Sequence, residues 1–124
     1  MLLVDDEGVT RYLVRQLLPR GVYDVREAES GTEGLARLLS EPPDVVLLDL
    51  KMPEMTGFEL LDRIGDETSL DGIPAIVLTS AILNPSERER LRRAARIMSK
   101  SDLTATALTG AIPDVLGGLP SEAV

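Results

Sequence analysis

Residues 47–57 read LLDLKMPEMTG, an apolar run that ends on one carboxylate, Asp49, before a loop punctuated by proline and glycine. The residues from Asp44 to Asp49 are almost continuously apolar, as expected of a central parallel strand that is covered on both faces. An aspartate in this position points out of the carboxyl end of its strand, where open α/β sheets bind their ligands. The stretch therefore predicts a parallel α/β fold with a functional site that includes Asp49.

Three further short apolar runs also end at polar side chains: Leu2–Val4 at Asp5 and Asp6, Ile76–Leu78 at Thr79, and Ile97–Met98 at Lys100. Together with Asp49, the strand ends thus supply three acids, a hydroxyl and an ammonium group. Carboxylates at one sheet edge suit Mg²⁺, and phosphoryl transfer depends mainly on positioning and charge neutralisation. The set predicts a Mg²⁺-assisted phosphoryl-transfer site with an aspartate as the acceptor.

The composition excludes several classes of function. The chain has 124 residues, which suits one domain, and it contains no cysteine and no histidine, so any histidine chemistry must come from a partner. The net charge of −8 argues against direct nucleic-acid binding. No apolar run approaches the roughly 18 residues of a membrane span, and MLLVDDE carries no basic leader, so we expect a cytoplasmic protein without membrane contact.

Short strand-like runs alternate with helix-length amphipathic segments, which is typical of a βα-repeated sheet. The predicted strands are Leu2–Val4, Val22–Glu27, Asp44–Asp49, Ile73–Leu78 and Ile97–Ser99. The predicted helices are Glu7–Leu18, 30–40, Gly57–Gly65, 85–96 and 101–116. We expect a doubly wound, flavodoxin-like (βα)₅ fold with strand order 2-1-3-4-5, which brings Asp5, Asp6 and Asp49 together. Residues 1–116 would form this domain, and 117–124 a tail or the start of a linker.

Four motifs, in this order and spacing, resemble the receiver domain of two-component response regulators. They are VDDE (Val4–Glu7), LLDLKMPEMTGFEL (Leu47–Leu60), PAIVLTS (Pro74–Ser80) and the isolated Lys100. The resemblance extends from Leu2 to about Leu116.

The resemblance implies a role for each site residue. Asp49 would accept a phosphoryl group from the phosphohistidine of a histidine kinase or phosphotransfer domain. Asp5 or Asp6, with Asp49 and the backbone carbonyl of Lys51, would hold Mg²⁺. Thr79 and Lys100 would each contact a phosphoryl oxygen, and an output domain or partner protein would dock on the fourth helix, the last strand and the last helix.

Two residues depart from the family pattern. The family usually has an aromatic residue where this chain has Ile97, so the coupled switch would take another form here. Lys100 is followed by Ser101 instead of proline, and we expect a trans peptide bond because a non-proline cis bond costs about 2.5–4 kcal/mol. The stretch IMSKSDL resembles receivers attached to hybrid histidine kinases. The domain itself is expected not to be an enzyme, whereas the parent protein could be such a kinase.

Arg88, Arg92 and Arg96 recur at a spacing of four on the predicted fourth helix. They form either a solvated face with Glu89–Arg93 pairing or a docking stripe for a partner. Two alternatives to the receiver function remain. A haloacid-dehalogenase-type phosphohydrolase also uses an aspartate nucleophile, but its second aspartate is replaced here by Lys51. A degenerate receiver would act only as a phosphorylation-independent interaction module.

Overall fold

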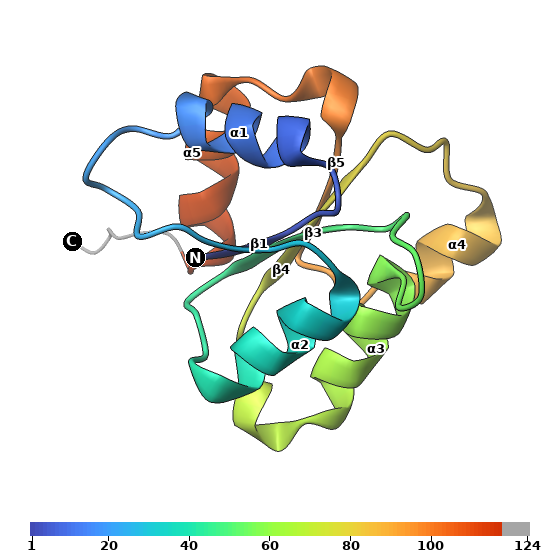
Figure 1. Ribbon diagram of the computed structural model, residues 1–124. Coiled ribbons are helices and arrows are strands. Elements are labelled where there is room, and N and C mark those ends of the chain that lie inside the picture. The colour runs from blue at the N-terminus through green and yellow to red at the C-terminus, as the bar shows by residue number, and fades with distance from the viewer. Residues whose placement is uncertain (118–124) are drawn as a thin grey trace.

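The computed structural model describes residues 1–117. A five-stranded parallel sheet forms the middle of three layers, with helices on both of its faces (Figure 1). The strands are β1 (Leu2–Val4), β2 (Arg26–Ala28), β3 (Val46–Asp49), β4 (Ala75–Thr79) and β5 (Arg96–Ser99). The helices are α1 (Gly8–Leu17), α2 (Gly31–Ser40), α3 (Gly57–Asp66), α4 (Pro85–Arg90) and α5 (Ala105–Val115), with short 3₁₀ turns at Thr68–Leu70 and Lys100–Asp102. The strand order β2-β1-β3-β4-β5 confirms the predicted doubly wound fold.

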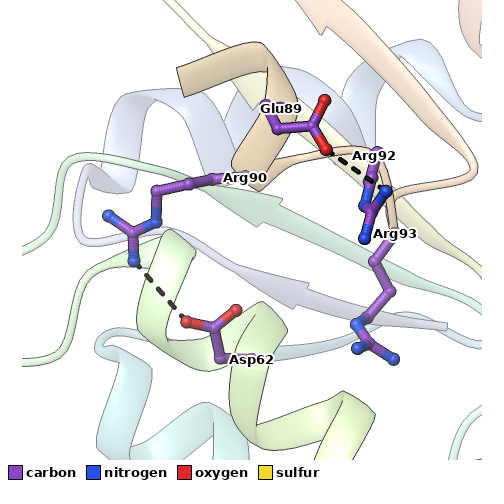
Figure 2. Close-up of a pocket in the computed structure, with 5 residues that line it drawn as sticks. All are labelled: Asp62, Glu89, Arg90, Arg92 and Arg93. Atoms are coloured by element: carbon purple, nitrogen blue, oxygen red, sulfur yellow. Dashed lines mark ion pairs between the residues drawn. The ribbon is translucent and has the colours of Figure 1, made fainter. Parts of the chain in front are cut away.

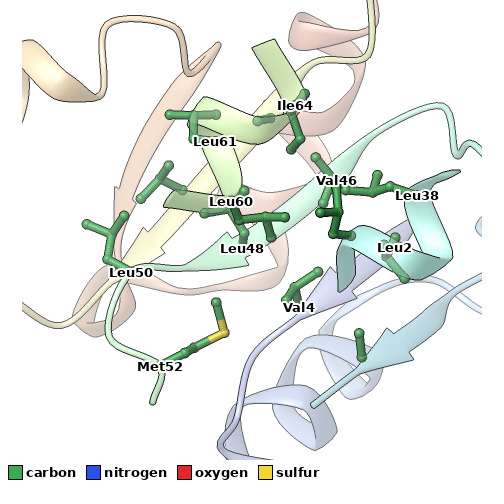
Figure 3. Close-up of a cluster of buried hydrophobic side chains, with 14 of the residues drawn as sticks. Leu2, Val4, Leu38, Val46, Leu48, Leu50, Met52, Leu60, Leu61 and Ile64 are labelled. Carbon is green, nitrogen blue, oxygen red and sulfur yellow. The ribbon is translucent and has the colours of Figure 1, made fainter. Parts of the chain in front are cut away.

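Helices cover both faces of the sheet: α1 and α5 lie on one side, and α2 and α3 on the other (Figure 1). Because the central strands are buried on both faces, their alternate side chains enter two separate cores. Leu48 and Val4 belong to the core beneath α2 and α3 (Figure 3), whereas Leu3 and Leu47 belong to the core beneath α1 and α5. The two cores fix the register of β1 against β3, which pairs Val4 with Leu48 and so aligns the residues that follow them.

The helix starts follow local capping chemistry. Ser30 accepts a hydrogen bond from the amide of Glu33 at the start of α2, as expected from the sequence. Thr56 and Asn84 form complete capping boxes at the starts of α3 and α4. The final helix differs from the prediction. Thr104 caps it, because Lys100–Asp102 forms a separate 3₁₀ turn before it.

Three other sequence predictions were wrong in detail. The fourth helix ends at Arg90, because the following residues form a turn and Arg96 already belongs to β5. The stripe of Arg88, Arg92 and Arg96 on one helix face therefore does not exist. The predicted second strand was too long, since only Arg26–Ala28 pairs with β1.

The buried face of α1 is also rotated from the prediction. In the sequence, Val9, Leu13 and Leu17 recur at a spacing of four, which predicts a helix face toward the core, but Val9 and Leu13 are 81% and 40% exposed. Thr10 and Val14 are buried instead, and Leu17 is only partly covered. The rotation leaves Val9, Leu13 and the 67% exposed Tyr12 on the surface.

No helix within residues 1–117 is long and apolar enough to cross a membrane. The predicted domain boundary at residue 116 stays a prediction, because nearly all of the predicted tail lies outside the described residues.

Candidate functional site

Three carboxylates meet at the carboxyl edge of the sheet. Asp5 and Asp6 follow β1 directly, and Asp49 is the last residue of the neighbouring β3. One carboxylate oxygen from each lies within 4.8 Å of the others. Asp5 and Asp49 are buried, and Asp6 is exposed. The adjacency of β1 and β3 at the switch point thus produces the acidic cluster that the sequence predicted.

Asp49 is held in a fixed orientation and in an unfavourable environment. Its Oδ1 accepts a hydrogen bond of 2.9 Å from the amide of Leu50, while the whole residue is only 4% exposed. Burial, and then the nearby carboxylate of Asp5, raise the pKa of Asp49 to about 6. At neutral pH the side chain is therefore mainly ionised, but its charge has lost much of its hydration.

Lys100 brings a positive charge into the cluster. Its Nζ lies 2.9 Å from Asp5 Oδ2 and 3.6 Å from Asp49 Oδ1, and it donates a 2.9 Å hydrogen bond to Glu7 Oε1. Burial alone would lower the pKa of Lys100, but its contacts with Asp5 and Glu7 raise it overall. The Lys100–Ser101 bond is trans, as predicted, since residues 1–117 contain no cis peptide.

The remaining predicted residues lie beside this cluster. Thr79 ends β4 and is buried, one position beyond Leu78, the partner of Asp49 in the β3–β4 register. Its Oγ1 accepts a 3.0 Å hydrogen bond from the amide of Ala81, which ties the hydroxyl to the loop before α4. Lys51 is exposed in the loop that follows Asp49.

Ile97 is half-buried against the core beneath α3. Together with Thr79 and Leu83 it lines an open hollow of about 290 Å³ beneath the β4–α4 loop.

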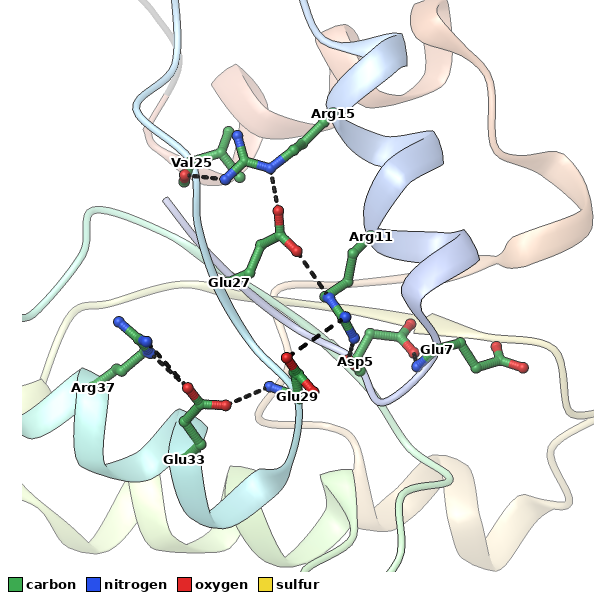
Figure 4. Close-up of polar contacts among 9 residues, drawn as sticks. All are labelled: Asp5, Glu7, Arg11, Arg15, Val25, Glu27, Glu29, Glu33 and Arg37. Atoms are coloured by element: carbon green, nitrogen blue, oxygen red, sulfur yellow. Dashed lines mark hydrogen bonds and ion pairs between the residues drawn. The ribbon is translucent and has the colours of Figure 1, made fainter.

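Sequence reasoning missed two residues that shape the site. Glu7 lies at the N-terminus of α1 and binds Lys100, which lowers the pKa of Glu7. Arg11, one turn later, donates a 2.6 Å hydrogen bond to the backbone carbonyl of Asp5. It also forms an ion pair with Glu27 at 2.8 Å (Figure 4). Glu7 was visible in the VDDE motif, but nothing in the strand-end pattern indicated Arg11.

The cluster has the features of a magnesium site. Asp5 Oδ2 is buried, and its partner within residues 1–117 is the Lys100 ammonium, 2.9 Å away. One ammonium leaves the charge of the three acids only partly neutralised, and a bound cation would balance the rest. The donor set consists only of oxygen atoms, which is what Mg²⁺ prefers.

Comparisons with known proteins agree with this geometry. The model of the response regulator receiver domain matches residues 1–105, so the chain belongs to this family. Protein PilH of Pseudomonas aeruginosa is 34% identical over 64% of this chain and 66% of its own length. The chain spans between 39% and 66% of the first curated relatives that it matches.

Solved structures show the same fold. The chemotaxis protein CheY4 of Vibrio cholerae superposes with a TM-score of 0.82 at 28% identity, covering 92% of this chain and 95% of CheY4. The receiver domain of a signal transduction histidine kinase from Syntrophus aciditrophicus also gives 0.82, at 25% identity, over 99% of this chain and 94% of that one. This chain is thus a receiver of the kind found in two-component signalling, a family whose domains are generally not classical enzymes.

Proposed function

We propose that Asp49 is the phosphoacceptor of this receiver. The observation that carries the proposal is the buried Asp49 carboxylate, poorly hydrated and placed between two further acids and the Lys100 ammonium. A carboxylate with little hydration is a better nucleophile than one in bulk water, because less solvent must be removed before it attacks.

The reaction is a phosphoryl transfer between two proteins. An oxygen of Asp49 forms a bond to phosphorus as the phosphorus–nitrogen bond of a phosphohistidine breaks, and the imidazole leaves with its electron pair. The chain has no histidine, so the donor belongs to a histidine kinase or a phosphotransfer domain. The product is an aspartyl phosphate in this chain and a free histidine in the donor.

The residues around Asp49 hold the charges of this reaction in place. Asp5, Asp6, Asp49 and the backbone carbonyl of Lys51 would hold Mg²⁺, which neutralises phosphoryl oxygens when bound. Lys100 exchanges its contact with Glu7 for a phosphoryl oxygen. Thr79 donates a hydrogen bond from its hydroxyl to another phosphoryl oxygen. Its hydroxyl hydrogen is available, because Thr79 Oγ1 only accepts a hydrogen bond from the amide of Ala81.

The surface supports two partner contacts. The exposed apolar residues Val9, Tyr12 and Leu13 on α1 offer an anchor for the phosphodonor, because α1 begins directly after the acidic pair. The output partner would use α4, β5 and α5. We place the domain in residues 1–116 of a cytoplasmic protein, and the likeness to the receiver of a histidine kinase supports a hybrid kinase as its parent.

One experiment separates a working receiver from a degenerate one. The protein is incubated with Mg²⁺ and a small acyl phosphate or amidophosphate, and its intact mass is measured. We expect one added phosphoryl group that Asp49→Asn abolishes, while the exposed Asp71→Asn retains it. No mass gain in the parent chain, or an equal gain in Asp49→Asn, would support the phosphorylation-independent interaction module instead.

A further inference from the structure

A cleft between α3 and the turn after α4 shares none of its lining residues with the acidic cluster. It is an open cleft of about 590 Å³, lined by Asp62, Glu89, Arg90, Arg92 and Arg93 (Figure 2). Three arginines and two acids line the cleft, which leaves it with an excess of one positive charge. The rest of the chain is strongly acidic, with a net charge of −8 overall.

Two of the arginines are held in place by neighbours. Arg90 lies over the ring of Phe58, 4.6 Å from its centre, and its Nη2 is 3.5 Å from Asp62. Arg92 pairs with Glu89 at 3.2 Å. Both guanidinium groups are thus oriented, but each remains more than half exposed and can bind a second anion.

Arg93 is oriented differently. Its guanidinium lies directly over Gly65 of α3, so that a Cβ atom at Gly65 would lie only 2.4 Å from Arg93 Cζ. Only a residue without a side chain lets the guanidinium approach α3 so closely. Within residues 1–117 no carboxylate lies in ion-pair range of Arg93, so its charge is uncompensated by the part of the chain that is described.

We propose that this cleft binds a small phosphate ester. The planar fork of a guanidinium matches two phosphate oxygens, and Arg93 has that fork free, while Arg90 and Arg92 line the same cleft. The volume lies within the range of small-molecule sites. Asp62 and Glu89 accept hydrogen bonds from hydroxyl or amino groups of the same ligand, which favours an organic phosphate over the bare ion.

Pyrophosphate serves as the probe, titrated at constant ionic strength in buffer freed of divalent metals and followed by the NMR signals of the Arg93 Nε–H and the Gly65 amide. We expect saturable shifts of both signals. Arg93→Gln should weaken binding at least tenfold, whereas Arg20→Gln, the same charge change on an exposed loop, should change it less than twofold. Equal losses in the two variants would mean non-specific charge attraction and would overturn the proposal.

Gly65→Ala tests the geometry without changing any charge. The added methyl group displaces the Arg93 guanidinium from its place over α3, so we expect weaker binding in a protein that unfolds cooperatively. The loss should be smaller than in Arg93→Gln, because the displaced side chain keeps its charge. Binding at the parent level in Gly65→Ala would contradict the proposal, as would tighter binding of a glutamate-rich peptide than of pyrophosphate. Asp49→Asn should bind pyrophosphate normally, which separates this site from the phosphoacceptor.

Discussion

At the scale of single residues, the site brings carboxylates together in a buried position, where their charges repel one another. Asp49 and Asp5 are both buried, and both depend on the one ammonium of Lys100, which also binds Glu7. The single ammonium of Lys100 does not neutralise all of these acids, so a bound cation would stabilise the cluster further. The metal-free protein should therefore be less stable than a variant without the Asp49 charge, and this difference should depend on pH.

Replacement of Asp49 by Asn measures this cost. The pKa of Asp49 is raised to about 6, so between about pH 4 and that value the folded state binds more protons than the unfolded chain. The free energy of unfolding contributed by Asp49 therefore falls as pH rises. In metal-free buffer we expect Asp49→Asn to be more stable than the parent by about 2–3 kcal/mol at pH 7.5, with little difference near pH 4.

Urea unfolding across this pH range checks the prediction. Asp71→Asn is the matched control. Because Asp71 is exposed, the same substitution there should change the free energy of unfolding by nearly the same amount at every pH. A stability gain for Asp49→Asn that did not grow with pH would show that the carboxylate is better solvated than its burial indicates.

Lys100→Ala should impair the structural response more than phosphorylation itself. Lys100 joins the loop after β5 to the acidic cluster through Asp5 and Glu7, so its loss uncouples that loop from the phosphoryl group. We expect the variant to gain phosphoryl mass from the small donor but to lose most of the amide shifts that phosphorylation causes in the parent. Lys51→Ala, which removes an exposed ammonium and keeps its backbone carbonyl, should behave like the parent. A full structural response in Lys100→Ala would contradict this role.

At the scale of elements, the loop after β3 is held against the start of α3. Gly57 donates a 2.9 Å hydrogen bond to the carbonyl of Leu50, and a Cβ atom there would lie 2.1 Å from the carbonyl oxygen of Asp49. The glycine thus lets α3 begin directly against the backbone of Asp49 and Leu50. The glycine at the end of the LLDLKMPEMTG stretch is therefore required by sterics, in addition to matching the family motif.

Two glycine-to-alanine changes should have opposite effects on stability. Gly57→Ala forces backbone atoms apart and should lower the free energy of unfolding by at least about 3 kcal/mol. Gly110→Ala lies inside α5 with no atom within 4 Å of the new methyl group, and should raise it by about 0.5–1 kcal/mol. Thermal or urea unfolding of both variants measures this. Equal effects would mean that α3 can move away from β3 at little cost.

The sequence predicted elements well where burial determines them and less well where it does not. The ends of β1 and β3 were placed correctly, because apolar runs mark buried parallel strands, and the end of β5 was correct as well. The end of β4 was placed one residue early, at Leu78 instead of Thr79. The buried face of α1 was misassigned. Val9 and Leu13 have the spacing of a core-facing helix stripe, but both lie on the exposed side.

The length of α4 was overestimated for a related reason. The arginine repeat continues to Arg96, but no residue of α4 is buried, and Leu91 alone anchors its end in the core. The contacts of Glu7 and Arg11 required three-dimensional proximity that no local pattern contains.

At the scale of the whole molecule, a cation should stabilise the fold by mass action. Mg²⁺ bound at Asp5, Asp6 and Asp49 favours the folded state, because the unfolded chain does not hold the three carboxylates together. We expect millimolar Mg²⁺ to raise the melting temperature by several degrees, with a much smaller rise in Asp6→Asn. Asp71→Asn should respond like the parent. An unchanged Mg²⁺ response in Asp6→Asn would remove Asp6 from the metal site.

The molecule also has an uneven distribution of local stability that should direct its response. Helices α2 and α3 pack on a continuous core, whereas α4 has six residues and buries none of them. Thr79 connects the site to this weak region, because its hydroxyl holds the amide of Ala81 at the start of the loop to α4. When Thr79 turns toward a phosphoryl oxygen, that hydrogen bond is released, and the least stable neighbouring element should rearrange first.

Hydrogen exchange before and after phosphorylation tests this route. We expect altered exchange in residues 80–90 and in β5, with α2 and α3 nearly unchanged. Ile97 is half-buried against the core beside the hollow next to Thr79, and it should stay buried in both states, because an isoleucine has no polar edge to present to solvent. Thr79→Val retains the shape of the side chain without the hydroxyl, so it should accept the phosphoryl group but lose the response of α4. Changes confined to α1, α2 and α3, with α4 silent, would refute both this route and the use of α4 as an output surface.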